Sequence, residues 1–243
     1  MPSKRTRRRG EVSSAKPGPA AGEIVKTDSV ISAIIFDLDG VLLDSEQVWD
    51  EVREQLVRER GGRWHEQAQR EMMGMSSTEW ARYMHDQLGV PDPPEEISAE
   101  VVRRLEDRYR ERLPLIEGAL EAVERLAANW PLGLASSSNR ELIDLVLDLG
   151  GLARFFRVTV SSEEVARGKP APDVYLEAAR RLGAPPERSV AIEDSENGIR
   201  AGKAAGMRVV AIPNPHFPPA EEALALADVT LGSLAELRPS TLA

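Results

Sequence analysis

The stretch that decides the fold is VISAIIFDLDG, which occupies residues 30–40. From Val30 to Phe36 it is mostly apolar and β-branched, a composition typical of a strand buried on both faces of a sheet. The run ends in Asp37 and Asp39, and residues two apart on an extended backbone point the same way. Gly40 permits a sharp turn behind them. The stretch therefore predicts a buried strand that carries two carboxylates into one site at its carboxyl end.

Strands and helices alternate along most of the remaining chain. Short apolar runs predict strands at Leu132–Ala135, Val158–Val160, Val190–Ile192, Val209–Ile212 and Val229–Leu231. Apolar residues spaced three and four apart predict helices at Glu117–Asn129, Glu141–Leu149, Asp173–Leu182 and Asn197–Ala205. Such alternation is typical of α/β proteins. We therefore expect a parallel sheet with helices on both faces.

Residues 45–113 break this alternation, because they show helical patterns and no convincing strand. The expected helices are Glu46–Arg60, Glu66–Met73, Ser77–Leu88 and Ser98–Arg112, with a loop at Pro91–Pro94. We expect an all-helical insertion over residues 45–113, set into a core made of residues 29–44 and 114–243. Residues 1–28, rich in Arg, Ser, Pro and Gly, predict a disordered basic tail.

Composition excludes several classes of protein. The chain has 243 residues and no cysteine, which excludes disulfides, thiolate metal sites and a cysteine nucleophile. The net charge of −9 disfavours nucleic acid as a partner. No apolar run approaches the roughly 18 residues of a transmembrane helix, so no membrane partner is expected. We expect a cytoplasmic monomer that acts on a small molecule.

Polar side chains gather where the predicted strands end. Asp37 and Asp39 follow the first strand, Ser136 the second, and Glu193-Asp194 the strand that begins at Val190. Ligands of an open parallel sheet bind at these carboxyl ends. Two carboxylates about 4 Å apart repel by about 4 kcal/mol at an effective dielectric of 20. A divalent cation relieves that repulsion, and an all-oxygen set favours Mg²⁺ over zinc.

Each of these residues also has a plainer interpretation. A lone Asp-x-Asp pair is more often a turn, Ser136 could cap the next helix, and Lys169 could be a solvated loop lysine. Their joint occurrence at strand ends favours a common site.

Four segments resemble the motifs of the haloacid dehalogenase superfamily, in the family order. They are Phe36–Ser45 (FDLDGVLLDS), Ala135–Asn139 (ASSSN), Gly168–Asp173 (GKPAPD) and Ile192–Ile199 (IEDSENGI). The resemblance spans about residues 30–235. It implies a Rossmann-like core, and the helical insertion is similar to the family's helical cap. The subgroup it resembles holds β-phosphoglucomutase and sugar-phosphate phosphatases.

The resemblance implies a role for each motif residue. Asp37 would be the nucleophile that forms an aspartyl-phosphate, and Asp39 the general acid and base. Lys169, Ser136 and Ser137 would bind the phosphoryl group. The residues implied to hold Mg²⁺ are Asp37, Asp39 (through its backbone carbonyl in relatives), Glu193 and Asp194.

The cap sequence departs from the mutase pattern at two places. Trp49 stands where the mutase has a histidine, and Ser77 stands where its loop carries an arginine that grips a second phosphate. Arg82 is a nearby arginine that could substitute. We expect Trp49, Met75 and Ser77 to contact substrate, and we expect the other large apolar cap residues to form the core of the cap.

These observations predict a Mg²⁺-dependent phosphatase acting on a small phosphate monoester, a phosphosugar or polyol phosphate. A phosphomutase is the alternative enzyme. Asp39 disfavours a haloacid dehalogenase, which does not need the second aspartate of this motif. The rival from another class is a phosphate-responsive or catalytically silent binding protein. A receiver domain, for example, lacks a large helical insertion and orders these residues differently.

Overall fold

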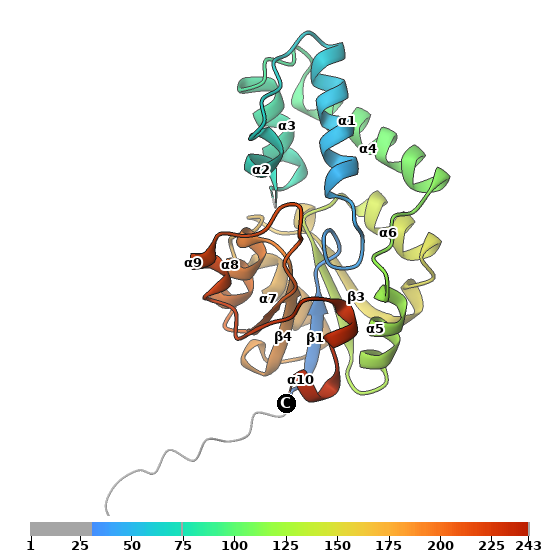
Figure 1. The fold of residues 1–243 in the computed structure, drawn as a ribbon, viewed down its shortest axis with the longest axis vertical. Coiled ribbons are helices and arrows are strands. Elements are labelled where there is room, and N and C mark those ends of the chain that lie inside the picture. The colour runs from blue at the N-terminus through green and yellow to red at the C-terminus, as the bar shows by residue number, and fades with distance from the viewer. Residues whose placement is uncertain (1–30, 74, 243) are drawn as a thin grey trace, which may run out of the picture.

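The structure is a computed structural model that describes residues 31–73 and 75–242. The predicted tail, residues 1–28, lies outside the described residues. The centre of the fold is a parallel sheet of strand order β3-β2-β1-β4-β5-β6 (Figure 1). Its strands are β1 (Ala33–Phe36), β2 (Leu132–Ser136), β3 (Phe156–Ser161), β4 (Ser189–Glu193), β5 (Arg208–Ala211) and β6 (Val229–Thr230). The predicted α/β class is confirmed, and β1 lies in the interior of the sheet, where both of its neighbours run parallel to it.

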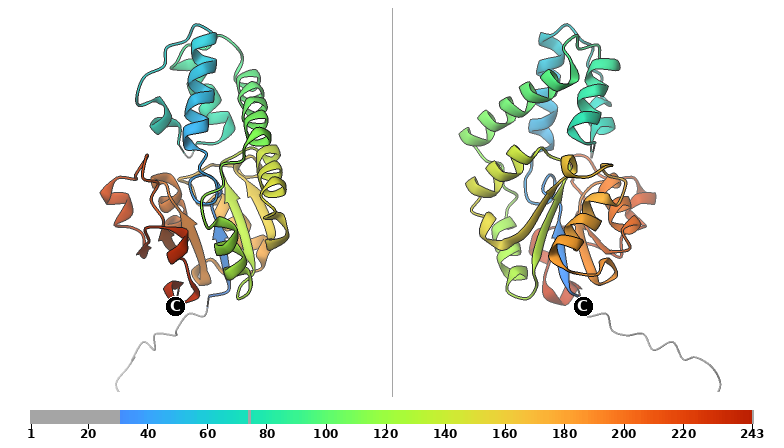
Figure 2. Two further views of the ribbon diagram at one scale, coloured as in Figure 1. Left: turned by 45° about the vertical axis from the view of Figure 1, so that its right-hand side comes forward. Right: turned by 180° about the vertical axis from the view of Figure 1, so that it is seen from behind.

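Helices cover both faces of the sheet (Figure 2). On one face α5 (Ala119–Ala127) and α6 (Arg140–Leu149) share a hydrophobic cluster with Ile34 and Phe36 of β1. On the other face α7 (Asp173–Leu182) and α8 (Glu196–Ala204) share a second cluster with Ile35. The alternation of Ile34, Ile35 and Phe36 between two cores explains why the strand is apolar throughout. The chain closes with α9 (Glu221–Leu224) and α10 (Pro239–Leu242).

Between β1 and α5, the described residues form four helices beyond the carboxyl edge of the sheet (Figure 1). They are α1 (Glu46–Glu59), α2 (Ala68–Met72), α3 (Ser77–Asp86) and α4 (Pro94–Glu111). We call these four helices the cap. The cap faces the strand ends at which the predicted catalytic residues lie.

The largest error in a predicted helix boundary is at the start of α4, whereas several other predicted helix ends differ from the structure by one or two residues. The structure begins α4 at Pro94, within the stretch predicted to be a loop and four residues before the expected start at Ser98. Proline is favoured in the first turn of a helix, because its missing N–H has no helical partner there and its φ already suits a helix. Glu95 and Glu96 add negative charge near the positive end of the helix dipole.

Candidate active site

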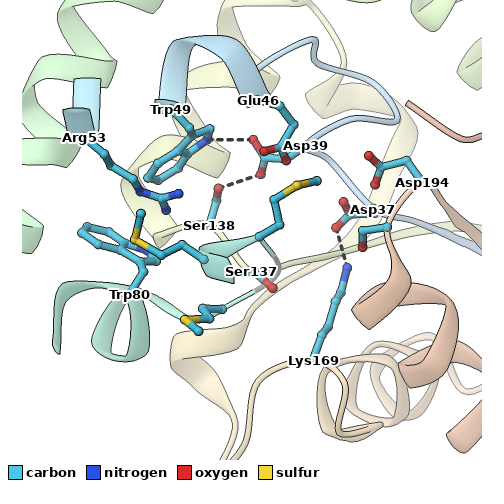
Figure 3. Close-up of a pocket in the computed structure, with 14 residues that line it drawn as sticks. Asp37, Asp39, Glu46, Trp49, Arg53, Trp80, Ser137, Ser138, Lys169 and Asp194 are labelled. Atoms are coloured by element: carbon cyan, nitrogen blue, oxygen red, sulfur yellow. Dashed lines mark hydrogen bonds and ion pairs between the residues drawn. The ribbon is translucent and has the colours of Figure 1, made fainter. Parts of the chain in front are cut away.

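Asp37 and Asp39 leave the end of β1 and line one cavity (Figure 3). The Asp37 amide continues the sheet pairing, donating to the carbonyl of Ile192 at 3.0 Å. The Asp39 carboxylate accepts hydrogen bonds from the hydroxyls of Ser45 at 2.6 Å and Ser138 at 2.7 Å. The i, i+2 spacing thus brings both carboxylates to a common site, as the sequence predicts.

The two carboxylates have different partners. Lys169 Nζ lies 2.6 Å from Asp37 Oδ1 and 2.6 Å from Glu193 Oε1. No lysine or arginine of the described residues forms an ion pair with Asp39, whose further partners are the indole N–H of Trp49 at 3.3 Å and the hydroxyl of Ser136 at 3.4 Å. Lys169 therefore places a positive charge against Asp37, while neutral donors hold Asp39 toward the cap.

Burial governs the protonation of the first pair. It raises the pKa of Asp37 well above its ordinary value, because the charge of Lys169 offsets only part of the desolvation. Burial also acts to lower the pKa of Lys169, but the charges of Asp37 and Glu193 outweigh it and keep that pKa above its ordinary value. Asp37 is therefore harder to ionise than a free aspartate, and positive charge beside it favours the carboxylate form.

Both oxygens of the Glu193 carboxylate accept hydrogen bonds. Its Oε1 accepts from Lys169 and from the hydroxyl of Tyr175, at 2.7 Å. Its Oε2 accepts from the backbone N–H of Asp194 at 3.1 Å and the hydroxyl of Ser195 at 3.2 Å. Such a carboxylate orients the loop after β4 and the lysine, rather than offering a free oxygen.

Asp194 is placed differently. It is buried, and its Oδ2 has no hydrogen-bond partner among the described residues. Burial, followed by the charges of Glu193 and Asp37, raises its pKa well above the ordinary value. An unpartnered buried oxygen is costly unless something positive meets it.

A divalent cation fits this arrangement. One oxygen each of Asp37 and Asp194, together with one oxygen of the hydrogen-bonded Glu193, lie within 4.8 Å of one another, so Asp37 and Asp194 are the side chains that could bind an ion directly. The donor set is entirely oxygen, which suits a hard cation. The side chain of Asp39 lies outside this group, so the expected Asp39 ligand would come from its main-chain carbonyl.

Two glycines make room for these carboxylates. Gly40 has φ of +76°, and a Cβ there would lie 1.9 Å from Oδ2 of Asp194. A Cβ on Gly198 would lie 1.9 Å from the Glu193 carboxylate. Any side chain at these positions would displace an acid of the site.

The serines at the end of β2 and directly after it lie on the opposite side of β1 from β4 and the acidic loop. Ser137 and Ser138 line the cavity. Ser136 is fully buried; its hydroxyl donates to Asp39 at 3.4 Å and accepts from the Ser138 N–H at 3.0 Å. The residue that caps α6 is Asn139, so the alternative of Ser136 as the helix cap does not hold. Sequence reasoning missed Ser138, although the run of three serines was the signal that pointed to it.

The cap contributes the remaining wall of the cavity. Trp49 and Met75 line it, as predicted. Ser77 does not belong to the lining: it is buried, and its hydroxyl donates to Glu163 at 2.7 Å. Its place at the start of α3 turns it toward the loop after β3. Six further residues line the cavity, and none of them was predicted to contact substrate. They are Glu46, Arg53, Met72, Met73, Trp80 and Ser195.

Glu46 and Arg53 were missed because they are the first residue of α1 and a residue two turns further along it, where charged side chains are usually solvated. Burial and the negative charge of Asp39 raise the pKa of Glu46 to about 7. Arg82, the arginine considered as a substitute, is exposed on α3 and lies outside the lining. The cation on the cap wall is therefore Arg53.

The cavity itself measures about 50 Å³. Small-molecule sites usually measure roughly 300–1,000 Å³. The cavity in this structure is therefore smaller than a typical small-molecule site.

The fold and these motifs define a family. Residues 34–212 match the haloacid dehalogenase-like hydrolases, and the chain belongs to that family. Hexitol phosphatase B of Escherichia coli K12 is 35% identical, over 88% of this chain and 97% of its own length. The probable pseudouridine-5'-phosphatase of Drosophila melanogaster is 33% identical, over 86% of this chain and 92% of its own length.

This chain is also similar to a solved structure. CbbY from Rhodobacter sphaeroides, in complex with phosphate, is 30% identical, with a TM-score of 0.75 over 86% of this chain and 96% of that chain. The protein is thus a phosphoric monoester hydrolase, as the sequence predicts. No helix in the described part of the chain combines the length and apolarity needed to cross a membrane.

Proposed function

We propose that the protein is a Mg²⁺-dependent phosphatase that hydrolyses a phosphosugar or polyol phosphate through an aspartyl-phosphate on Asp37. The single observation that carries the proposal is the position of Asp37 between the ammonium of Lys169 and the unpartnered oxygen of Asp194. Relatives named as hexitol phosphatase and as phosphorylated carbohydrates phosphatase support the substrate class.

The first half of the reaction forms the covalent ester. An Asp37 oxygen attacks phosphorus, the bond between phosphorus and the leaving-group oxygen breaks, and Asp39 gives that oxygen a proton. Ser45 and Ser138 hold the Asp39 carboxyl on the cap side of Asp37, where the leaving group must lie. Lys169 offsets negative charge on the phosphoryl oxygens and on Asp37.

The second half releases phosphate. Asp39, now ionised, takes a proton from water, and the water oxygen attacks phosphorus. The bond between phosphorus and Asp37 breaks, which restores the carboxylate and yields inorganic phosphate. The hydroxyls and backbone amides of residues 136–138 would hold the phosphoryl oxygens in both halves.

The metal would be held by Asp37, by Asp194 and by the main-chain carbonyl of Asp39. When bound, it would lower the repulsion between the anionic nucleophile and the anionic phosphate. Glu193 would act by orienting Lys169 and the loop that carries Asp194, because its own oxygens are already hydrogen-bonded.

The test is an Asp37→Asn variant. We expect phosphate release to fall to background while the variant stays folded, because an amide is a poor nucleophile and Lys169 keeps its contact with Glu193. In the unaltered enzyme, rapid quenching with ³²P-labelled substrate should trap protein-bound phosphate that hydroxylamine removes. Asp39→Asn should slow turnover by about 10² to 10⁴.

An exposed carboxylate of the cap, Asp86, supplies the control. Asp86→Asn should leave turnover unchanged. Normal phosphate release by Asp37→Asn would contradict the assignment of the nucleophile. Appearance of an isomeric phosphosugar without phosphate release would establish the phosphomutase instead.

Two further expectations, a monomeric state and a cytoplasmic location, stay predictions. Light scattering of the purified chain measures the first.

A further inference from the structure

Arg53 is the cationic side chain on the cap wall of the cavity. It comes from α1, its residue is 4% exposed, and its guanidinium end points toward the cavity (Figure 3). The guanidinium carbon lies 4.3 Å from the ring centroid of Trp49 and 4.8 Å from that of Trp80. The two rings meet edge to face, with centroids 5.8 Å apart. The aromatic rings therefore fix the position of the charge.

The hydrogen bonds of Arg53 are incomplete. Within the described chain, Nη1 donates to Oε1 of Gln69 at 3.1 Å, and Nε has no acceptor. The nearby carboxylate of Glu46 accepts from Gln69 Nε2 at 2.8 Å. Lys169, the other cation of the lining, is paired with two carboxylates. Arg53 is thus a buried cation at the cavity, and its Nε–H is a hydrogen-bond donor with no acceptor in the described chain.

The charge on Arg53 persists at neutral pH. Burial lowers its pKa to about 10, and the negative charges of Glu46 and Asp39 oppose that loss. Ring faces interact with the plane of a guanidinium and leave its in-plane N–H groups to other partners. Those donors match a planar pair of oxygens, which a carboxylate or a phosphate presents.

We propose that Arg53 binds an oxyanion, a carboxylate or a second phosphate, at the end of the substrate remote from the transferred phosphoryl group. This inference rests on the proposed function and narrows its substrate class to phosphosugars or polyol phosphates with a second anionic group. In the sequence, Ser77 stands in the cap loop where an arginine was expected, and Arg82 was the arginine considered as its substitute. The structure supplies a cation from a different element, α1.

The experiment measures binding and does not depend on turnover. Calorimetry on the Asp37→Asn protein with Mg²⁺ would compare three ligands that differ at one carbon: sorbitol 6-phosphate, 6-phosphogluconate and sorbitol 1,6-bisphosphate. Glycerol 1-phosphate and 3-phosphoglycerate form a shorter matched pair. The same titrations would be run on two double variants. Asp37→Asn/Arg53→Gln removes the charge, and Asp37→Asn/Arg53→Lys keeps the charge but lacks the paired N–H donors of a guanidinium. Asp37→Asn/Arg82→Gln removes an exposed cap arginine as the control.

We expect at least one anionic ligand to bind about tenfold or more tightly than its neutral partner. Arg53→Gln should bring the ratio of the two affinities close to one, with little change in the affinity for the neutral ligand. Arg53→Lys should retain part of the preference for the anionic ligand, and Arg82→Gln should retain all of it. A preference for the carboxylate or for the bisphosphate identifies the oxyanion. Equal binding in both matched sets, or a preference that survives Arg53→Gln in a protein of unchanged melting temperature, would overturn the inference. Failure of the unaltered enzyme to release phosphate from any ester would count against the proposed function alone.

Discussion

Gly40 shows how one residue without a side chain shapes the site. Its φ of +76° turns the chain after Asp39, and the space where a Cβ would lie holds the Asp194 carboxylate. Two demands therefore meet at this position: a left-handed backbone and the close approach of a buried acid. The first is common to many turns, but the second belongs to the site.

We predict that a comparison of Gly40→Ala with Gly61→Ala distinguishes the effect of backbone strain from the effect of displacing Asp194. Gly61 also has a left-handed backbone, with φ of +77°, but has open space around the added Cβ. Both variants should lose about 1–2 kcal/mol in urea unfolding, from backbone strain. Gly40→Ala alone should also lose about 100-fold or more in kcat and weaken Mg²⁺ activation, because Asp194 must move. Equal loss of activity in both variants would show that Asp194 does not depend on this space.

Among the elements, α5 shows how segments far apart in sequence are joined. From its last turn Arg125 donates to the backbone carbonyls of Leu234, at 3.1 Å, and Leu237, at 2.9 Å. These carbonyls belong to a short helical turn and its end near the C-terminus, and both leucines are buried. The arginine therefore fastens the C-terminal segment to the sheet-covering helix.

We predict that Arg125→Met lowers the free energy of unfolding by about 1–3 kcal/mol, because charged hydrogen bonds to two carbonyls are lost. Turnover should be unchanged, since Arg125 lies in the last turn of α5, on a face of the sheet and not at the carboxyl edge that the cap covers (Figure 1). Arg110→Met breaks an exposed ion pair with Glu106 on α4 and should cost no more than about 0.5 kcal/mol. Denaturant titration of both variants checks the contrast, which similar losses would refute.

At the scale of the whole molecule, the cluster of Asp37, Glu193 and Asp194 makes the stability of the folded protein depend on metal binding and on pH. Burial raises the pKa of both Asp37 and Asp194. In the metal-free protein, stability gained from their protonated forms is lost as the pH rises through their folded-state pKa values. A divalent cation stabilises the ionised forms and so reverses that loss.

We predict that Mg²⁺ raises the melting temperature, and raises it more at pH 8 than at pH 6, because protons compete with the metal. At 100 times its dissociation constant a ligand adds about 2.7 kcal/mol, which corresponds to about 5–10 °C for a chain of this size. EDTA should stop turnover. Asp194→Asn should abolish the Mg²⁺-dependent shift. A shift that is the same at both pH values, or that persists in Asp194→Asn, would argue against this cluster as the metal site.

Much of the architecture could be predicted because its signals are local. The predicted strand at Val190–Ile192 and helix at Asp173–Leu182 agree with β4 and α7 to within one residue at each end. Chain direction then places Asp37, Ser136 and Asp194 at one edge of a parallel sheet. The start of α4 was misplaced because Pro94 can either end a loop or open a helix, and here Glu95 and Glu96 follow it in the first turn of the helix.

The cap wall could not be predicted in the same way. A helical period predicts that Trp49, Arg53 and Trp80 lie in helices, but not which of them face the same cavity. That depends on how α1 packs against α3, and the long side chain of Arg53 can reach either solvent or the site. Ser77 turned away from the cavity for the same reason, because Glu163 of a distant loop accepts its hydrogen bond.

By itself, the sequence determined the order of strands and helices and the approach of the acids, the serines and Lys169 to the carboxyl edge. Both follow from periodicity and strand direction, which are properties of short segments. Only the tertiary structure decided that Lys169 bridges Asp37 and Glu193, that Oδ2 of Asp194 has no hydrogen-bond partner among the described residues, and that Arg53 lies against two indole rings. Those contacts join residues that are distant along the chain, and their geometry is set by the packing of whole elements against one another.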